Sequence, residues 1–172
     1  RLGYDGKGQV RVDTADQARA AYAELGDIAC VLEKRLTLAL EVSVIVTRSH
    51  PAQMAVFPVA ENQHAHGILD VSIVPARIDP ALATQAQNMA KQLAETLNYI
   101  GVLAVEFFVL ADNALVVSEI APRPHNSGHY TLDACLTDQF QQQVRALCGL
   151  LPGKTDLLSP VVMVNLLGDV WP

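Results

Sequence analysis

The sequence predicts an α+β fold built on a mostly antiparallel sheet with flanking helices. Short segments rich in β-branched residues alternate with turn residues, which is typical of consecutive strands. Two longer segments begin at capping residues and show apolar side chains at helical spacing. Apolar segments also flank a tight turn at Asp112-Asn113, the pattern of a β-hairpin.

The composition limits the class of protein. The 172 residues suffice for one domain, or for one domain with a small lid. Hydrophobic residues make up 51% and charged residues 17%, as in folded globular proteins. A net charge of −6 argues against general nucleic-acid binding, and no apolar run reaches the roughly 18 residues of a membrane span. Three cysteines without a CxxC pair indicate a reduced, cytoplasmic protein.

The first predicted elements surround a glycine-rich segment. Residues 3–9 are dense in turn residues, and the alternation at Val10 and Val12 predicts a hairpin loop running into a strand. Thr14, with Gln17 at the capping-box position, begins a helix that extends to about Leu25. The remaining predicted elements are strands at 28–33, 41–47, 52–59 and 68–75, a polar loop at 61–67, a helix at 79–98, strands at 101–110 and 115–120, a helix at 137–148 and a strand at 161–167.

The helix at 79–98 has the clearest signals. Asp79 is a capping residue and Pro80 suits the first helical position. Its apolar stripe comprises Leu82, Ala86, Met89, Ala90, Leu93 and Leu97.

Two glutamates lie equally far from the turn at Asp112-Asn113. A two-residue loop there would pair Glu106 with Glu119 across the hairpin, on one face of the sheet. Facing like charges are destabilising unless something offsets them, and carboxylate oxygens suit magnesium. The alternative is one glutamate at a solvent edge and the other paired with an arginine. A bulge would shift the register and separate the two carboxylates.

The segment after Glu119 gathers directional polar groups. Arg123 is a planar donor for phosphate or carboxylate oxygens, and His125 and Asn126 add a titratable and a neutral group. Two prolines stiffen the loop, and Ser127-Gly128 allows close approach of a ligand. These features favour a binding or catalytic loop over a polar cap for the next helix. The glycine-rich segment could likewise bind phosphate, although a plain tight turn explains it equally well.

Several motifs occur together in one order. They are GYDGKGQ at 3–9, Glu33-Lys34, EVS at 41–43 and EIAPRPHNSGH at 119–129. This series resembles the 5-(carboxyamino)imidazole ribonucleotide synthetases (ATPase subunits of phosphoribosylaminoimidazole carboxylase), a family of ATP-grasp ligases, over essentially the whole chain. The resemblance implies an ATP-grasp fold with part of a lid subdomain at 1–35, which holds the glycine loop and adenine hinge, and a central domain at 36–172.

The resemblance also implies an activity. The family uses ATP to carboxylate aminoimidazole ribonucleotide with bicarbonate, through carboxyphosphate, giving ADP and phosphate in purine biosynthesis. It implies Mg²⁺ and ATP as cofactors and a homodimer for the full-length protein. The alternatives are another ATP-grasp carboxylate–amine ligase or a non-catalytic nucleotide-binding module.

Site residues follow from the same resemblance. Glu106 and Glu119 would hold magnesium, with Ser118 where the family usually has asparagine. The catalytic residues would be Arg123, His125 and Asn126. The nucleotide-binding residues would be Tyr4, Asp5, Gly6, Lys7, Gly8 and Gln9 over the phosphates, Glu33, Lys34, Arg35 and Leu36 at adenine, Glu41 at the ribose, and His64, Ser118 and Glu119. The family also has an upstream domain and a basic C-terminal segment, so we expect the fragment alone to be inactive.

Overall fold

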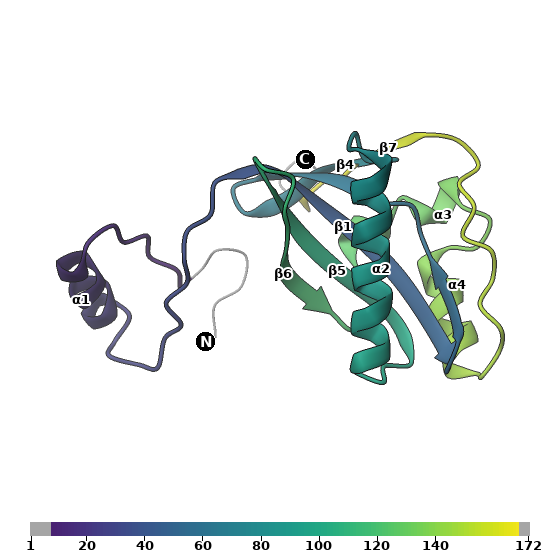
Figure 1. Cartoon of the computed structure of the whole chain (residues 1–172), viewed down its shortest axis with the longest axis horizontal. Coiled ribbons are helices and arrows are strands. Elements are labelled where there is room, and N and C mark those ends of the chain that lie inside the picture. The colour runs from purple at the N-terminus through teal and green to yellow at the C-terminus, as the bar shows by residue number, and fades with distance from the viewer. Residues whose placement is uncertain (1–7, 169–172) are drawn as a thin grey trace. The chain divides into compact units, whose positions relative to one another are not determined.

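The computed structural model describes residues 8–168, which form two compact units (Figure 1). The first ends at Leu36 and also includes His66–Ile68. The second comprises Thr37–Ala65 and the described residues from Leu69 onward. Four residues of the expected glycine loop, Tyr4 to Lys7, lie outside the described residues. The expected assignment of lid and central domain stays a prediction.

In the first unit, the described residues form one helix, α1 (Ala15–Glu24). Its predicted start is confirmed, because Thr14 and Gln17 form a complete capping box. The strands predicted at Val10–Val12 and at 28–33 are wrong, since no strand of the described residues precedes β1. Alternating side chains favour an extended chain, but a strand also requires a partner for its backbone groups.

A mostly antiparallel sheet dominates the second unit, as predicted (Figure 1). Its path is β6-β5-β1-β3-β4-β7, and β2 pairs with β1 beside it. Every pairing whose register is described is antiparallel. The strands are β1 (Leu38–His50), β2 (Gln53–Val56), β3 (Ala60–Ala65), β4 (Ile68–Val74), β5 (Gly101–Leu110), β6 (Leu115–Ala121) and β7 (Val161–Val164).

The polar loop predicted at 61–67 is instead mostly strand β3. Its backbone pairs with β1, where Glu41 faces Asn62. The polar side chains have specific partners, because Glu61 pairs with Arg77 and Asn62 accepts a hydrogen bond from Ser72. Polarity therefore misled the prediction, since a strand between two others can bury polar residues when each is paired.

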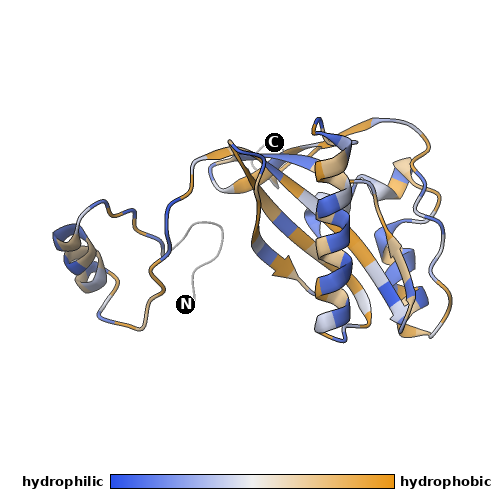
Figure 2. Cartoon of the chain, in the orientation of Figure 1, coloured by the Kyte–Doolittle hydropathy of each residue, from blue (hydrophilic) through white to orange (hydrophobic). Residues whose placement is uncertain are grey.

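One face of the sheet packs against α2 (Pro80–Thr96). Asp79 caps this helix as predicted, and Figure 2 shows its alternating hydrophilic and hydrophobic bands. An apolar core lies beneath this helix. It contains the buried side chains of Val42, Val44, Val46, Leu103, Val105, Phe107, Leu82, Ala86, Ala90 and Ala94.

The predicted stripe of α2 is confirmed except at its end. Leu97 is 52% exposed, whereas Ala94, which the prediction omitted, is buried. Leu97 is the C-cap residue, where the helix path ends. No helix among the described residues combines the length and apolarity needed to cross a bilayer.

The opposite face carries η1 (Asn126–Gly128), α3 (Thr131–Ala134) and α4 (Gln139–Leu147). Helix α4 contacts β1 and β5. It buries Gln139, Gln142 and Ala146, while Val144 and Leu147 are 60% and 68% exposed. Polar side chains therefore face the sheet here, in contrast to α2.

The β5–β6 hairpin places the two glutamates opposite one another. Glu106 pairs with Glu119, as predicted. The predicted two-residue loop is wrong, however, because Val109 pairs with Leu115 and Phe107 with Val117, one residue out of the expected register. A bulge at Ser118 then restores the alignment. The two deviations cancel, so both glutamates occupy the same face.

Candidate functional site

The candidate site lies on the sheet face opposite α2. In β1 and β5, Ser43 is the ladder partner of Glu106, which in turn pairs with Glu119 of β6. Glu41 precedes Ser43 by two residues and therefore projects from the same face. The Ser43 hydroxyl is buried and has no hydrogen-bond partner among the described residues. Three carboxylates and an unpaired hydroxyl thus share one side of the sheet.

Glu106 is the electrostatic centre of this group. Burial raises the pKa of Glu106; His64 opposes the rise, and the charges of Glu119 and Glu41 add to it. A buried carboxylate near two like charges is costly without a compensating cation. The residues present therefore fit a divalent ion, and magnesium commonly uses one or two carboxylates together with phosphate oxygens.

The described residues contain no group of three or more histidine, cysteine, aspartate or glutamate side chains positioned around one metal. A magnesium ion at Glu106 and Glu119 would accordingly need further oxygen ligands from a bound substrate or from water.

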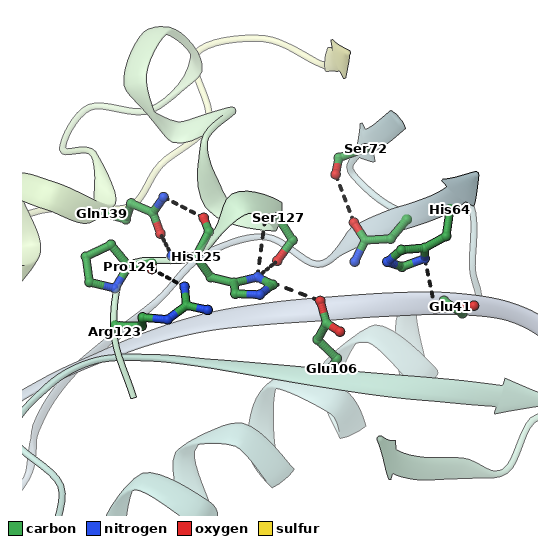
Figure 3. Close-up of polar contacts among 10 residues, drawn as sticks. Glu41, His64, Ser72, Glu106, Arg123, Pro124, His125, Ser127 and Gln139 are labelled. Atoms are coloured by element: carbon green, nitrogen blue, oxygen red, sulfur yellow. Dashed lines mark hydrogen bonds and ion pairs between the residues drawn. The ribbon is translucent and has the colours of Figure 1, made fainter. Parts of the chain in front are cut away.

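Glu41 and His64 form a second polar pair beside Glu106. The Nδ1 atom of His64 lies 3.0 Å from Oε2 of Glu41 (Figure 3). This hydrogen bond raises the pKa of His64, against the opposing effect of burial, and the charges of Glu41 and Glu106 raise it further. The structure therefore joins two residues that the resemblance assigns to the nucleotide.

His125 faces Glu106 from the loop after β6. Its Nδ1 lies 3.7 Å from Oε1 of Glu106 (Figure 3). The same nitrogen accepts a hydrogen bond from the backbone N–H of Ser127 at 3.3 Å and lies 2.9 Å from the Ser127 hydroxyl. An accepting Nδ1 places the proton of the neutral ring on Nε2.

The environment keeps the His125 ring neutral. Burial, reinforced by the charges of Arg123, His129 and His64, lowers the pKa of His125 to about 4. At neutral pH, the ring is therefore a hydrogen-bond donor through Nε2 and a weak base.

The other two predicted catalytic residues differ in their surroundings. Arg123 is exposed, and its Nη1 donates to the neighbouring Pro124 carbonyl at 3.0 Å. The Oδ1 atom of Asn126 is buried and has no partner among the described residues. The exposed guanidinium of Arg123 can bind an anion, and Oδ1 of Asn126 can accept a hydrogen bond.

Gln139, which the sequence analysis did not assign to the site, fixes this loop. Its side-chain amide hydrogen-bonds both backbone groups of His125 (Figure 3). Ser43 and Ser127 were named in the sequence only as parts of motifs, without a role for their hydroxyl groups. The available signal for Gln139 was its position on the sheet-facing side of α4, where an apolar residue is expected.

Most of the remaining predicted nucleotide-binding residues belong to the first unit. Gly8, Gln9, Glu33 and Lys34 are exposed in the first unit. In the same unit, Nη1 of Arg35 lies 3.5 Å from Oδ1 of Asp13, and Leu36 is half-buried. Ser118 and Glu119 are exposed on β6.

Comparison with known proteins gives a consistent result. A model of the ATP-grasp domain matches residues 1–140. The N5-carboxyaminoimidazole ribonucleotide synthase of Bacillus subtilis is 53% identical over 169 residues, which is 98% of this chain. The corresponding synthase of Brucella melitensis is 48% identical over 171 residues. The chain spans 44% and 47% of these two relatives.

Solved structures show the same similarity. An N5-carboxyaminoimidazole ribonucleotide synthetase in complex with ADP superposes with a TM-score of 0.90 at 53% identity, over 97% of this chain and 44% of that one. The Aspergillus clavatus synthase, in complex with ADP and 5-aminoimidazole ribonucleotide, superposes with a TM-score of 0.85 at 32% identity. The match covers 95% of this chain and 44% of that one.

Proposed function

Because this chain belongs to the ATP-grasp family, we propose that it forms the central part of an enzyme that carboxylates aminoimidazole ribonucleotide. In this reaction, bicarbonate takes the γ-phosphoryl group of ATP to give carboxyphosphate and ADP. The ribonucleotide amine then attacks the carboxyl carbon, forming the carbamate and releasing phosphate. The observation that carries the proposal is the Glu106–Glu119 pair, which shares a sheet face with Glu41 and faces His125.

Glu106 and Glu119 would hold magnesium. When bound, the ion would neutralise phosphate charge and align the transferred group. The raised pKa of Glu106 supports this role, since its causes include the nearby carboxylates whose repulsion a cation would offset. Ser118 would act through the bulge that turns Glu119 toward Glu106, so its serine side chain is compatible with the site.

Glu41 and His64 would bind the nucleoside part of ATP. Their hydrogen bond fixes the Glu41 carboxylate and leaves its second oxygen available to a ribose hydroxyl. The partial burial of both side chains favours a pre-positioned contact over a freely rotating one. The glycine loop, Tyr4 to Gln9, would close over the phosphates, and residues 33–36 would contact adenine.

His125, Arg123 and Asn126 would act on the reacting groups. A neutral His125 can donate from Nε2 to an anionic oxygen of bicarbonate or carboxyphosphate, which stabilises developing charge. Arg123 is exposed and can pair with a phosphate or carboxylate. The unpaired Oδ1 of Asn126 can accept a hydrogen bond from the attacking amine.

We extend the proposal to assembly and location. The exposed Val144 and Leu147 on α4 offer an apolar contact surface for the homodimer expected of the full-length protein. Sedimentation of the full-length protein tests this, because a monomer at all concentrations would contradict it.

The three free cysteines are compatible with a reducing, cytoplasmic location.

An assay of the full-length protein tests the proposed reaction. We expect ADP release from MgATP and bicarbonate to rise when aminoimidazole ribonucleotide is added, with carbamate formed in step. ADP release that ignores the ribonucleotide, with no carbamate, would contradict the proposal.

A further inference from the structure

Gln139 makes an unusual contact for a helix residue beneath a catalytic loop. Gln139 is 0% exposed. The oxygen and the nitrogen of its side-chain amide both form hydrogen bonds with the backbone of His125. Nε2 donates to the His125 carbonyl at 2.8 Å, and Oε1 accepts from the His125 N–H at 2.9 Å. The side chain thus satisfies both backbone groups of His125, as a neighbouring strand would.

The surroundings anchor the backbone of Gln139 and leave space for its side chain. The backbone N–H of Gln139 donates to the Thr131 hydroxyl at 3.0 Å, and that hydroxyl donates to the Gly128 carbonyl at 2.6 Å. A Cβ atom at Gly128 would lie only 2.5 Å from Oε1 and 2.8 Å from Cδ of Gln139. Gly128 therefore leaves the space that the amide occupies.

The contact determines where the His125 ring lies. The backbone of His125 is held by Gln139, and its Nδ1 is held by Ser127. With both ends fixed, the ring stays beside Glu106 (Figure 3). An apolar residue at 139 would fill similar space but leave the His125 N–H unpaired. The His125 carbonyl would keep only its hydrogen bond from the Gly128 N–H at 3.0 Å.

We propose that Gln139 is a positioning residue that holds His125 in its reactive place through the backbone. The catalytic consequence rests on the proposed function, whereas the contact itself does not. Displacing a reacting group by about 1 Å can lower a rate by about 100-fold, so loosening this contact should affect kcat more than ATP binding.

Helix α4 provides a matched control. Gln142 lies one turn further along, is also 0% exposed, and binds Gly153 in the same two-ended way. Its Nε2 donates to the Gly153 carbonyl at 2.8 Å, and its Oε1 accepts from the Gly153 N–H at 2.9 Å. The two glutamines differ in which loop they hold, so a general loss of stability should affect both variants alike.

The test compares Gln139→Met and Gln142→Met in the full-length protein, together with Gln139→Glu. Hydrogen-exchange mass spectrometry follows peptides containing His125 and Gly153, and steady-state assays give kcat and the KM for ATP. We expect Gln139→Met to speed exchange around His125 and to lower kcat at least about tenfold, with the KM for ATP changed about twofold or less. Gln142→Met should speed exchange around Gly153 and leave kcat within about twofold.

The conservative variant sharpens the test. The carboxylate of Gln139→Glu keeps an acceptor for the His125 N–H but has no donor for its carbonyl, so we expect a kcat between those of the parent and Gln139→Met. Unchanged exchange around His125 in Gln139→Met, or equal losses of kcat in both methionine variants, would overturn the proposal. A parent protein that forms no carbamate but shows the expected exchange pattern would overturn the proposed function while supporting the contact.

Discussion

The two helices on opposite faces of the sheet are held by different forces. Helix α2 packs on β1 and β5 through Leu82, Ala86, Ala90 and Ala94, which belong to one apolar cluster. Helix α4 packs on the same two strands with Gln139 and Gln142 turned inward and Val144 and Leu147 turned outward. Both arrangements are buried, but the fully buried side chains of α2 are apolar, whereas those of α4 include two glutamines that make directional hydrogen bonds.

Apolar packing and buried hydrogen bonds contribute differently to the stability of the fold and to the position of the loops. Apolar packing is non-directional and tolerates small shifts of a helix, provided that volume is conserved. Hydrogen bonds from a buried amide fix both distance and angle, and they are costly to break. Both faces of the sheet bury an apolar cluster. We infer that the α4 face, in addition, fixes the loop that carries His125.

The largest expected effect comes from Gly128→Ala on the α4 face. The added methyl would overlap the Gln139 amide, so we expect kcat to fall about 100-fold and stability to fall by about 1–3 kcal/mol. Gly168→Ala is the control, because no atom of the described residues lies within 4 Å of its added Cβ. Urea unfolding and steady-state kinetics of both variants give the two quantities; a Gly128→Ala enzyme with full kcat would remove the distinction between the faces.

The second prediction concerns the α2 face. Leu82→Ala should lower the free energy of unfolding by about 2–5 kcal/mol, because it leaves a cavity in the apolar core. At a temperature where the variant is folded, kcat should stay within about twofold of the parent. Leu97→Ala, at the exposed end of the same helix, should change stability by less than about 0.5 kcal/mol. A kcat loss in folded Leu82→Ala would show that the faces are coupled.

The smallest expected effect is a contrast between two histidines on the α4 face. The pKa of His64 is raised by Glu41, and that of His125 is lowered to about 4 by burial and nearby positive charges. The His64–Glu41 pair therefore stabilises the fold fully below the unfolded pKa of about 6.5. This contribution is lost as pH rises through the higher folded pKa.

NMR titration without nucleotide or metal checks the contrast. Glu41→Gln should lower the pKa of His64, whereas His125 should remain neutral down to about pH 5 in both proteins. A His64 pKa that does not respond to Glu41→Gln would contradict the pair as the cause of the shift.

Local signals in the sequence sufficed for much of the fold. Capping residues located the starts of α1 and α2, and a run of apolar residues interrupted by Glu106 located β5. Strand β3 was missed because its polar residues are paired only in the folded sheet. The strand predicted at 28–33 failed for the converse reason, since β propensity does not provide a pairing partner.

The part of the site that depends on the type of side chain could be predicted from the sequence. Glu106, Glu119 and His125 could be singled out because charged or titratable groups stand in or beside apolar strands. The bulge at Ser118 could not be predicted. One extra residue in the turn of the hairpin and one in β6 leave Glu106 and Glu119 paired, as they would be without either change. Gln139 was missed because its role depends on which side of α4 faces the loop.

Magnesium-dependent nucleotide binding tests the central claim most directly. Calorimetry of the full-length protein with ADP, in magnesium and in EDTA, compares the parent with Glu106→Gln, Glu119→Gln and the double variant, with the exposed Glu95→Gln as control. We predict that magnesium tightens ADP binding to the parent and to Glu95→Gln, and that the double variant loses this gain. A double variant that keeps the full magnesium dependence would contradict the assignment of Glu106 and Glu119 as the metal-binding pair.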